Sequence, residues 1–385
     1  MPLSVFTAAY FAHAGFFNPF LPLWLKELGL GLVVISALTA VQSLTRMFAP
    51  YAWGALSDRT GERVRLLRAG ALIALAVSAG LWFNGGAWWV GLVLLLMFAQ
   101  TSGMMPMTEA ALAHVVTVNG VFDTKRYGRV RLWGSLGFML AVLGAGAWFE
   151  AFGMHYFPLM ANLTLVALVL SAYRLPDARE VPHLHGEKAA SIRYILLQPQ
   201  VRWLFAAIFF HVLSHMGIYT FFSLYLDALG YSKTTIGLLW AVSVTVEIGW
   251  FFTQGRWMPR LSLTAWLVLC AGVMVLRMGV TAAAAEVLWL LVLAQALHAI
   301  TFAAHHSTCI ALLSHHFPGK LRGRGQALYS VIGYGVPGVA GGLLGGLLSE
   351  HWGLNSVFWA TAFTSVLATG CAVRVWRLQH SGDKP

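Results

Sequence analysis

Two ionisable side chains of opposite charge lie inside apolar stretches of the first half of the sequence. Glu109 follows a run of methionine, proline and threonine, and Arg131 begins a run rich in glycine and aromatic residues. A charge inside such a segment is costly, and an ion pair removes much of that cost. If the two segments are neighbouring antiparallel helices, both side chains lie at similar depth. We expect Arg131 to pair with Glu109, either at a ligand site or only to hold two helices together.

A second group of ionisable residues lies in apolar segments of the other half. Glu247, His298 and His305 are candidates for proton coupling, because glutamate and histidine are the side chains that a buried proton relay uses. His298 and His305 are seven residues apart and would share one helix face. Packing roles are the alternative, and Arg46 is a possible ion-pair partner for Glu247. A metal site at His305 and Cys309 is disfavoured, since no acid or second cysteine completes it.

The elements that position these residues are membrane-spanning helices. The chain has 385 residues, of which 58% are hydrophobic and 10% are charged, and its mean hydropathy is +0.71; a soluble domain carries about 25% charged residues. A span needs about 20 mostly apolar residues. This pattern predicts an all-α membrane protein whose twelve spans lie near 3–25, 31–53, 66–84, 88–115, 128–149, 155–173, 201–226, 232–253, 262–281, 286–314, 325–348 and 355–376.

The basic residues predict the orientation of these spans. With the N-terminus inside, the outer loops hold only Lys26 and Lys233, and nearly all other lysines and arginines fall on the cytoplasmic side. The net charge of +11 therefore reflects topology and does not indicate a nucleic-acid partner. The N-terminal stretch lacks a basic region, so we interpret it as a retained first span and not as a signal peptide. Both termini are expected in the cytoplasm.

The spans divide into two similar halves. A shift of 201 residues superimposes Gly54 on Gly255 and Arg59 on Arg260, in the same order along both halves. Repeated six-span halves are typical of secondary transporters, with the substrate site at the interface between the repeats. We predict two pseudo-symmetric six-helix bundles, a cytoplasmic linker and a short tail, at 1–174, 201–378, 175–200 and 379–385.

The segment after the second span, GALSDRTGER, resembles the signature of the major facilitator superfamily. The residues that carry the match are Gly54, Asp58, Arg59, Gly61 and Arg63. Physically, Gly54 would allow close helix approach, Gly61 a tight turn, and Asp58 a cap on a helix N-terminus. By resemblance, the segment closes the cytoplasmic side of the transporter. The copy in the second half lacks the acid, so this gate is expected on one side.

Two further resemblances concern the transport chemistry. The patterns around Glu109 and Arg131 (Pro-x-x-Glu-Ala and Gly-Arg-x-Arg-x-x-Gly) are similar to those of lactose-permease-like sugar symporters, in which the matching residues bind substrate. LHAITFAAHH at 297–306, the eighth-span Glu247 and GRVRLWGSLGF at 128–138 resemble the 3-phenylpropionate transporter group of the superfamily. Thr301 stands where the sugar symporters carry a further acid, so their proton route is not carried over intact.

By the same resemblance, spans one, four, seven and ten line a central cavity. Its expected lining includes Tyr10, His13 and Asn18 on the first span and His215 and Tyr219 on the seventh. An aromatic cavity with one arginine suits an aromatic monocarboxylate, with ring against rings and carboxylate on guanidinium. Ordinary aromatic packing is the alternative interpretation of these residues.

The sequence thus predicts a proton-coupled symporter that imports a small aromatic carboxylate, such as 3-phenylpropionate, by alternating access. We expect a monomer in the bacterial inner membrane that needs protons and a small-molecule substrate but no cofactor or metal. A sugar or nucleoside symporter is the first alternative, followed by an exporter of hydrophobic compounds. We disfavour a membrane enzyme, because the sequence contains no HExxH motif or nucleotide-binding loop. We disfavour a sensor, because the sequence offers no output domain beyond a short tail.

Overall fold

The protein is described by a computed structural model that covers residues 2–118, 121–122, 124–176, 193–318 and 321–382. Nearly all of these residues are helical, because long apolar runs in a membrane satisfy their backbone groups within each segment. The chain divides into two compact units. Unit 1 is Met1–Gly186 with Tyr231–Leu238, and unit 2 is Glu187–Gly230 with Leu239–Pro385.

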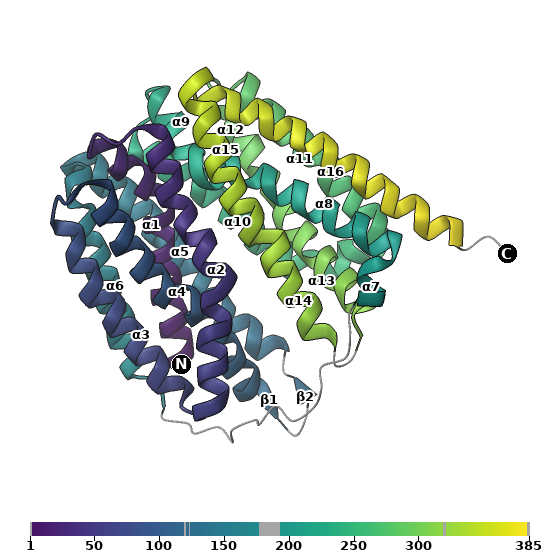
Figure 1. The fold of residues 1–385 in the computed structure, drawn as a ribbon, viewed down its shortest axis with the longest axis horizontal. Helices are drawn as coiled ribbons and strands as arrows, with labels where there is room; N and C mark the ends of the chain where they lie inside the picture. The colour runs from purple at the N-terminus through teal and green to yellow at the C-terminus, as the bar shows by residue number, and fades with distance from the viewer. Residues whose placement is uncertain (1, 119–120, 123, 177–192, 319–320, 383–385) are drawn as a thin grey trace. The chain divides into compact units, whose positions relative to one another are not determined.

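Six long helices, drawn from purple to blue in Figure 1, make up most of the described part of unit 1. A small antiparallel hairpin of β1 (Thr117–Val118) and β2 (Val121–Phe122) connects the fourth and fifth of them. The helices are α1 (Pro2–Glu27), α2 (Leu32–Thr60), α3 (Arg63–Ser78), α4 (Gly86–Val116), α5 (Thr124–Phe152) and α6 (Phe157–Tyr173).

Shorter helical pieces make up unit 2, drawn from teal to yellow, because several of its spans are interrupted (Figure 1). Single π-helical turns interrupt three of these spans, at Gly217–Phe221, Ala299–Ala304 and Val331–Gly335. The helices are α7 (Arg193–Leu197), α8 (Pro199–Met216), α9 (Phe222–Ala228), α10 (Lys233–Trp257, whose first residues belong to unit 1), α11 (Leu263–Ala283), α12 (Leu288–Ala296), α13 (His305–His316), α14 (Arg322–Ser330), α15 (Val336–Trp352) and α16 (Leu354–Gly382).

Eleven helical spans among the described residues are long and apolar enough to cross a membrane. The 26-residue helix α1 comes in addition, so the prediction of about twelve spans is confirmed. Each span has a buried face within its unit and leaves many large apolar side chains exposed, as helices in a lipid bilayer do. The last helix, α16, continues to Gly382, past the predicted start of a tail at 379.

Helices α1 and α5 approach each other through glycines. A side chain on Gly15 would begin 2.6 Å from the carbonyl oxygen of Phe138, and one on Gly137 would overlap the carbonyl of Ala8. Ring contacts fill the rest of this packing: Phe16 and Phe17 of α1 contact one another and Phe157 of α6. Small residues at a helix interface let backbones approach closely, and here they bring α1 against the helix that carries Arg131.

Candidate functional site

The predicted pair of Arg131 and Glu109 lies within unit 1. Arg131 Nε of α5 is 3.6 Å from Glu109 Oε1 of α4, and the two side chains are 44% and 29% exposed. The Arg131 guanidinium also lies over the ring of Phe11 on α1, 4.9 Å from its centroid. The arginine therefore touches an anion and an aromatic face at once, and both of its contacts remain accessible.

A hollow in unit 1 contains the three first-span residues that the sequence singled out. Asn18 Oδ1 accepts a hydrogen bond of 3.0 Å from Gln42 Nε2 on α2. His13 Nδ1 lies 2.9 Å from the hydroxyl of Thr164 on α6, and the Tyr10 hydroxyl donates to a backbone carbonyl of α4. The hollow is lined by Tyr10, His13, Ala14, Phe17, Asn18, Gln42, Phe98 and Thr101. Tyr10, His13 and Asn18 of α1 therefore line a cavity whose walls are both aromatic and polar.

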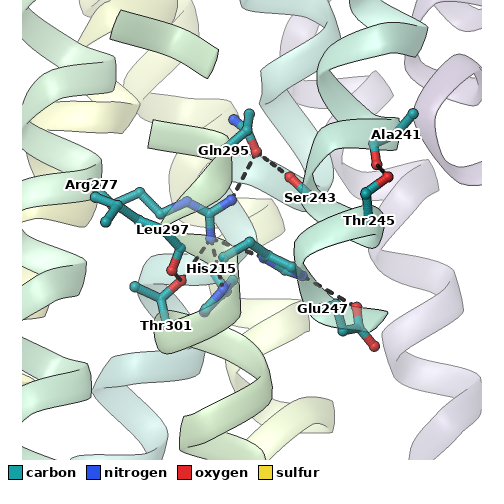
Figure 2. Close-up of polar contacts among 10 residues, drawn as sticks. His215, Ala241, Ser243, Thr245, Glu247, Arg277, Gln295, Leu297 and Thr301 are labelled. Atoms are coloured by element: carbon teal, nitrogen blue, oxygen red, sulfur yellow. Dashed lines mark hydrogen bonds and ion pairs between the residues drawn. The ribbon is translucent and has the colours of Figure 1, made fainter. Parts of the chain in front are cut away.

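The most extensive polar cluster of the described residues is in unit 2, around Arg277 of α11. Arg277 is fully buried, and Figure 2 shows its guanidinium pointing to Gln295 and Thr301. Its Nη2 donates to Gln295 Oε1 at 2.8 Å, and Ser243 of α10 donates to the same oxygen at 2.6 Å. Its Nη1 donates to Thr301 Oγ1 at 2.9 Å and lies 3.3 Å from His215 Nε2. A buried cation is tolerated only with such partners.

His298 connects this cluster to Glu247. Its Nδ1 lies 3.1 Å from Arg277 Nη1, and its Nε2 lies 3.5 Å from Glu247 Oε2. A guanidinium only donates, so His298 Nδ1 faces Nη1 as an acceptor and shares the two N–H groups of Nη1 with Thr301 and His215; the ring proton of a neutral His298 is then on Nε2, facing the carboxylate. His298 is therefore a neutral bridge between a cation and an anion. A second proton on the ring would turn Nδ1 into a donor facing a donor, so that contact would have to break.

His305 belongs to different surroundings. Its ring stacks on His211 of α8 with centroids 3.6 Å apart and planes 10° apart, and Cys309 Sγ lies 3.5 Å from its Nε2. The expectation that His298 and His305 share one helix face assumed a regular α-helix, and the π turn Ala299–Ala304 between them changes the register. His215 lies between the two groups of contacts, because its Nε2 faces Arg277 and its ring centroid is 5.4 Å from that of His211. Its ring also stacks on Tyr219 at 5.6 Å.

The segment that resembles the superfamily signature is mostly helical. Helix α2 continues to Thr60, so Asp58 lies in its last turn, and the residue that precedes α3 is Glu62, without a side-chain cap. The side chain of Asp58 lies outside the described part of the chain, and its expected role as a cap on a helix N-terminus stays a prediction. A Cβ added to Gly54 would have no described atom within 4 Å, and the expected close helix approach there stays a prediction.

One expectation at this segment, the tight turn at Gly61, agrees with the geometry. Gly61 has φ of +66° and ends α2 with its N–H on the Ser57 carbonyl, as a tight turn requires. Arg63 Nε donates to the Ser57 hydroxyl at 3.2 Å, while Arg59 is exposed. The gating role of these residues stays a prediction.

The sequence predicts no role for Arg277 or Gln295, and it places His211 only in the aromatic lining expected on the seventh span. The signal for Arg277 was present, because an arginine inside a 20-residue apolar run marks a functional site by default. Gln295 and His211 had weaker signals, since single polar residues in spans are common and their partners come from other helices. Contacts of Glu247 within unit 2 include His298; its pairing with Arg46 stays a prediction.

A helical membrane protein of two compact units, with ionisable residues inside its spans, has the architecture of a secondary transporter. Residues 1–360 match the model of the MFS_1 like family, and the chain belongs to that family of major facilitator transporters.

Curated relatives cover nearly the whole chain. The probable 3-phenylpropionic acid transporter of Escherichia coli (strain K12) is 26% identical over 369 residues, 96% of this chain and 95% of that protein. The maltose permease of Geobacillus stearothermophilus is 28% identical over 356 residues, 91% of this chain and 87% of that protein.

Among solved structures, a variant of the nucleoside transporter NupG superimposes with a TM-score of 0.83 at 14% identity, covering 97% of this chain and 98% of that one. A POT family transporter in complex with 5-aminolevulinic acid superimposes with a TM-score of 0.77 at 11% identity, covering 100% of this chain and 96% of that one. Identities this low establish the major facilitator fold alone.

Proposed function

We propose that this transporter is a proton-coupled symporter that imports a small aromatic carboxylate such as 3-phenylpropionate by alternating access. The observation that carries the substrate class is the setting of Arg131, whose accessible guanidinium faces the Glu109 carboxylate and the Phe11 ring. An aromatic carboxylate offers the same two groups in one molecule. Its carboxylate would replace Glu109 on Arg131, and its ring would pack against aromatic side chains.

In this proposal Glu109 holds Arg131 while the site is empty. The half-exposed pair is weak enough to exchange, because ion pairs with access to water contribute only about 0.2–1 kcal/mol. Tyr10, His13 and Asn18 of unit 1 and His215 and Tyr219 of unit 2 complete the proposed set of substrate-binding residues. The similarity to the probable 3-phenylpropionic acid transporter over 96% of this chain supports the same substrate class.

Proton coupling is assigned to Glu247, His298 and His305. The bridge that His298 forms between Arg277 and Glu247 supports this assignment. His298 can accept from Arg277 only when its Nδ1 carries no proton. Protonation of Glu247 or His298 would change which contacts the Arg277 cluster can make, and α10, α11 and α12 all contribute to that cluster. A proton carried with the anion would offset the negative-inside membrane potential.

We also propose that the protein is a monomer in a bacterial inner membrane, with both termini in the cytoplasm. The asymmetry of lysine and arginine between predicted loops supports this orientation. The signature segment Gly54–Arg63 would then lie at the cytoplasmic end of α2, where a gate is expected.

The test is uptake into proteoliposomes that contain the purified protein. Labelled 3-phenylpropionate, maltose and a nucleoside would be offered with and without an imposed inward proton gradient. We expect accumulation of 3-phenylpropionate that depends on the gradient. Uptake of maltose or nucleoside without 3-phenylpropionate would refute the substrate class, and uptake of 3-phenylpropionate that ignores the gradient would refute the coupling.

A sugar symporter is the second candidate. The similarity to a maltose permease favours it, and so does the amide pair of Asn18 and Gln42, because amides serve the many hydrogen bonds that a sugar needs. The two candidates also differ in the role of Glu109. A sugar would need its carboxylate as an acceptor, whereas an aryl carboxylate would displace it.

A further inference from the structure

Gln295 of α12 links two other helices of unit 2 through a single oxygen atom. Figure 2 shows its side chain between Arg277 of α11 and Ser243 of α10. Its Oε1 accepts from Arg277 Nη2 at 2.8 Å and from Ser243 Oγ at 2.6 Å. A guanidinium only donates, so the amide oxygen and not the NH2 group must face Arg277. The serine is then a second donor that holds this oxygen in place.

The amide nitrogen of Gln295 is buried and has no partner within the described part of the chain. The residue is 1% exposed, and its Nε2 is among the buried side-chain atoms that lack a hydrogen bond there. An unpaired buried donor is costly, so a native protein keeps one only where the group serves another purpose. A methionine of similar size would avoid this cost. The choice of glutamine therefore indicates that the acceptor on Arg277 is what this position supplies.

The guanidinium of Arg277 is matched unevenly to its surroundings. The two N–H groups on Nη1 face three acceptors, which are Thr301 Oγ1 at 2.9 Å, His298 Nδ1 at 3.1 Å and His215 Nε2 at 3.3 Å. The single N–H on Nε has no partner among the described residues. Because the guanidinium is planar and rigid, the bond from Nη2 to Gln295 restricts where Nη1 points. Gln295 thus holds Arg277 in the orientation that reaches His298.

Gln295 also leaves the charge of Arg277 in place. In the described structure no carboxylate forms an ion pair with Arg277, and Glu247 lies beyond His298, next to the other ring nitrogen. A carboxylate at position 295 would bind the guanidinium more strongly than a neutral amide does, because such a hydrogen bond is charge-assisted. The protein has a neutral acceptor here instead. The positive charge therefore continues to face the ring of His298.

We propose that Gln295 is a positioning residue for proton coupling, which orients Arg277 toward His298 without neutralising it. The inference rests on the proposed function, in which Glu247 and His298 carry the coupled proton. A cation beside His298 Nδ1 opposes a second proton on that ring. The charged and titratable groups that face His298 are Arg277 of α11, Glu247 of α10 and His215 of α8, whose ring centroid is 5.9 Å away. An anion at position 295 would change this balance by one charge.

The test uses two variants of the full-length protein in proteoliposomes. Uptake of labelled 3-phenylpropionate, or of maltose if the wild type accumulates only that sugar, is measured at a fixed proton gradient over a series of pH values. The pH of half-maximal uptake is the midpoint that is compared. Gln295→Glu keeps the acceptor and adds a negative charge, which favours a proton on His298. We expect its midpoint to move up by about 1–3 pH units, the effect of a nearby opposite charge.

Gln295→Met is the second variant, and it tests orientation without a change of charge. It keeps the size of the side chain but offers Arg277 no oxygen. We expect gradient-driven uptake to fall by about 10-fold or more, the scale of a lost hydrogen bond to a charged group, while the midpoint stays at the wild-type pH. Gln254→Glu is the matched control, because it makes the same charge change on a half-buried glutamine whose Oε1 accepts from Ser307. Its uptake and midpoint should equal those of the wild type.

The outcomes separate the inference from the function on which it rests. A folded Gln295→Glu protein with the wild-type midpoint overturns the inference, even if wild-type uptake follows the gradient. An equal shift in Gln254→Glu also overturns it. If Gln295→Glu yields no monodisperse protein, normal uptake by Gln295→Met overturns the inference, and reduced uptake at an unchanged midpoint supports it. Wild-type uptake that ignores the gradient refutes the proposed symport and, with it, a coupling role for Gln295.

Discussion

Replacing Glu109 by glutamine should tighten the binding of an aromatic carboxylate. In the proposed mechanism, Arg131 must leave Glu109 before it can bind the substrate anion, so the energy of that pair is subtracted from the affinity. The two atoms are 3.6 Å apart and the side chains are 44% and 29% exposed. Solvent-exposed pairs of this kind contribute about 0.2–1 kcal/mol, which corresponds to about 1.4- to 5-fold in dissociation constant.

The assay is equilibrium binding of 3-phenylpropionate to purified protein, with Arg131→Gln as the partner variant. Arg131→Gln should move the affinity in the opposite direction, because it removes a charge-assisted hydrogen bond of about 1.5–3 kcal/mol, or about 13- to 160-fold. Weaker binding to Glu109→Gln would refute this reasoning. It would mean that Glu109 contacts the ligand directly, as a sugar hydroxyl requires, and maltose should then be the better ligand.

Three further predictions concern the helices that hold the site. Glu247→Gln should abolish accumulation driven by a proton gradient while exchange of labelled for unlabelled substrate continues, because the carboxylate facing His298 is lost; normal gradient-driven accumulation would contradict its role. Arg277→Met should destabilise the protein by about 1–3 kcal/mol for each buried acceptor that it leaves unpaired, seen as a lower melting temperature in detergent than for the wild type; an unchanged melting temperature would contradict it. Gly137→Ala should lower the yield of monodisperse protein, because the new methyl overlaps the Ala8 carbonyl, whereas Gly144→Ala on the same helix, with open space around it, should not.

The helical fold could be predicted because it depends on local composition. Runs of about 20 apolar residues and the positions of lysine and arginine suffice to define spans, and the family similarity confirms the architecture. The ends of the spans were less certain. The Gly54–Arg63 segment looks like a loop, because its charged residues resemble an interface, yet α2 continues through it to Thr60.

The candidate site was predictable where the two partners lie on neighbouring spans. Arg131 and Glu109 are each costly alone, and that cost is visible in the sequence, so their pairing follows from depth alone. The contacts of His298 and His305 could not be predicted from their positions in the sequence. A π turn depends on tertiary packing and has no simple sequence signal, so it altered the expected helix face.

The role of Arg277 was also hidden, for another reason. Its partners come from two other spans and are separated from the arginine by 18 to 62 residues in sequence. They are His215, Gln295, His298 and Thr301. No spacing rule connects them. Only the three-dimensional arrangement shows that these polar groups surround one cation.

The glycine contacts between α1 and α5 have a mechanical consequence. Where backbone meets backbone, as at Gly15 with Phe138 and at Gly137 with Ala8, no flexible side chain is available to absorb a displacement. The two helices must therefore move as one rigid body. This packing couples the backbone at Arg131 to the backbone of Tyr10, His13 and Asn18 on α1. If Arg131 binds an anion as proposed, the separation between that group and the hollow would select ligands by their length.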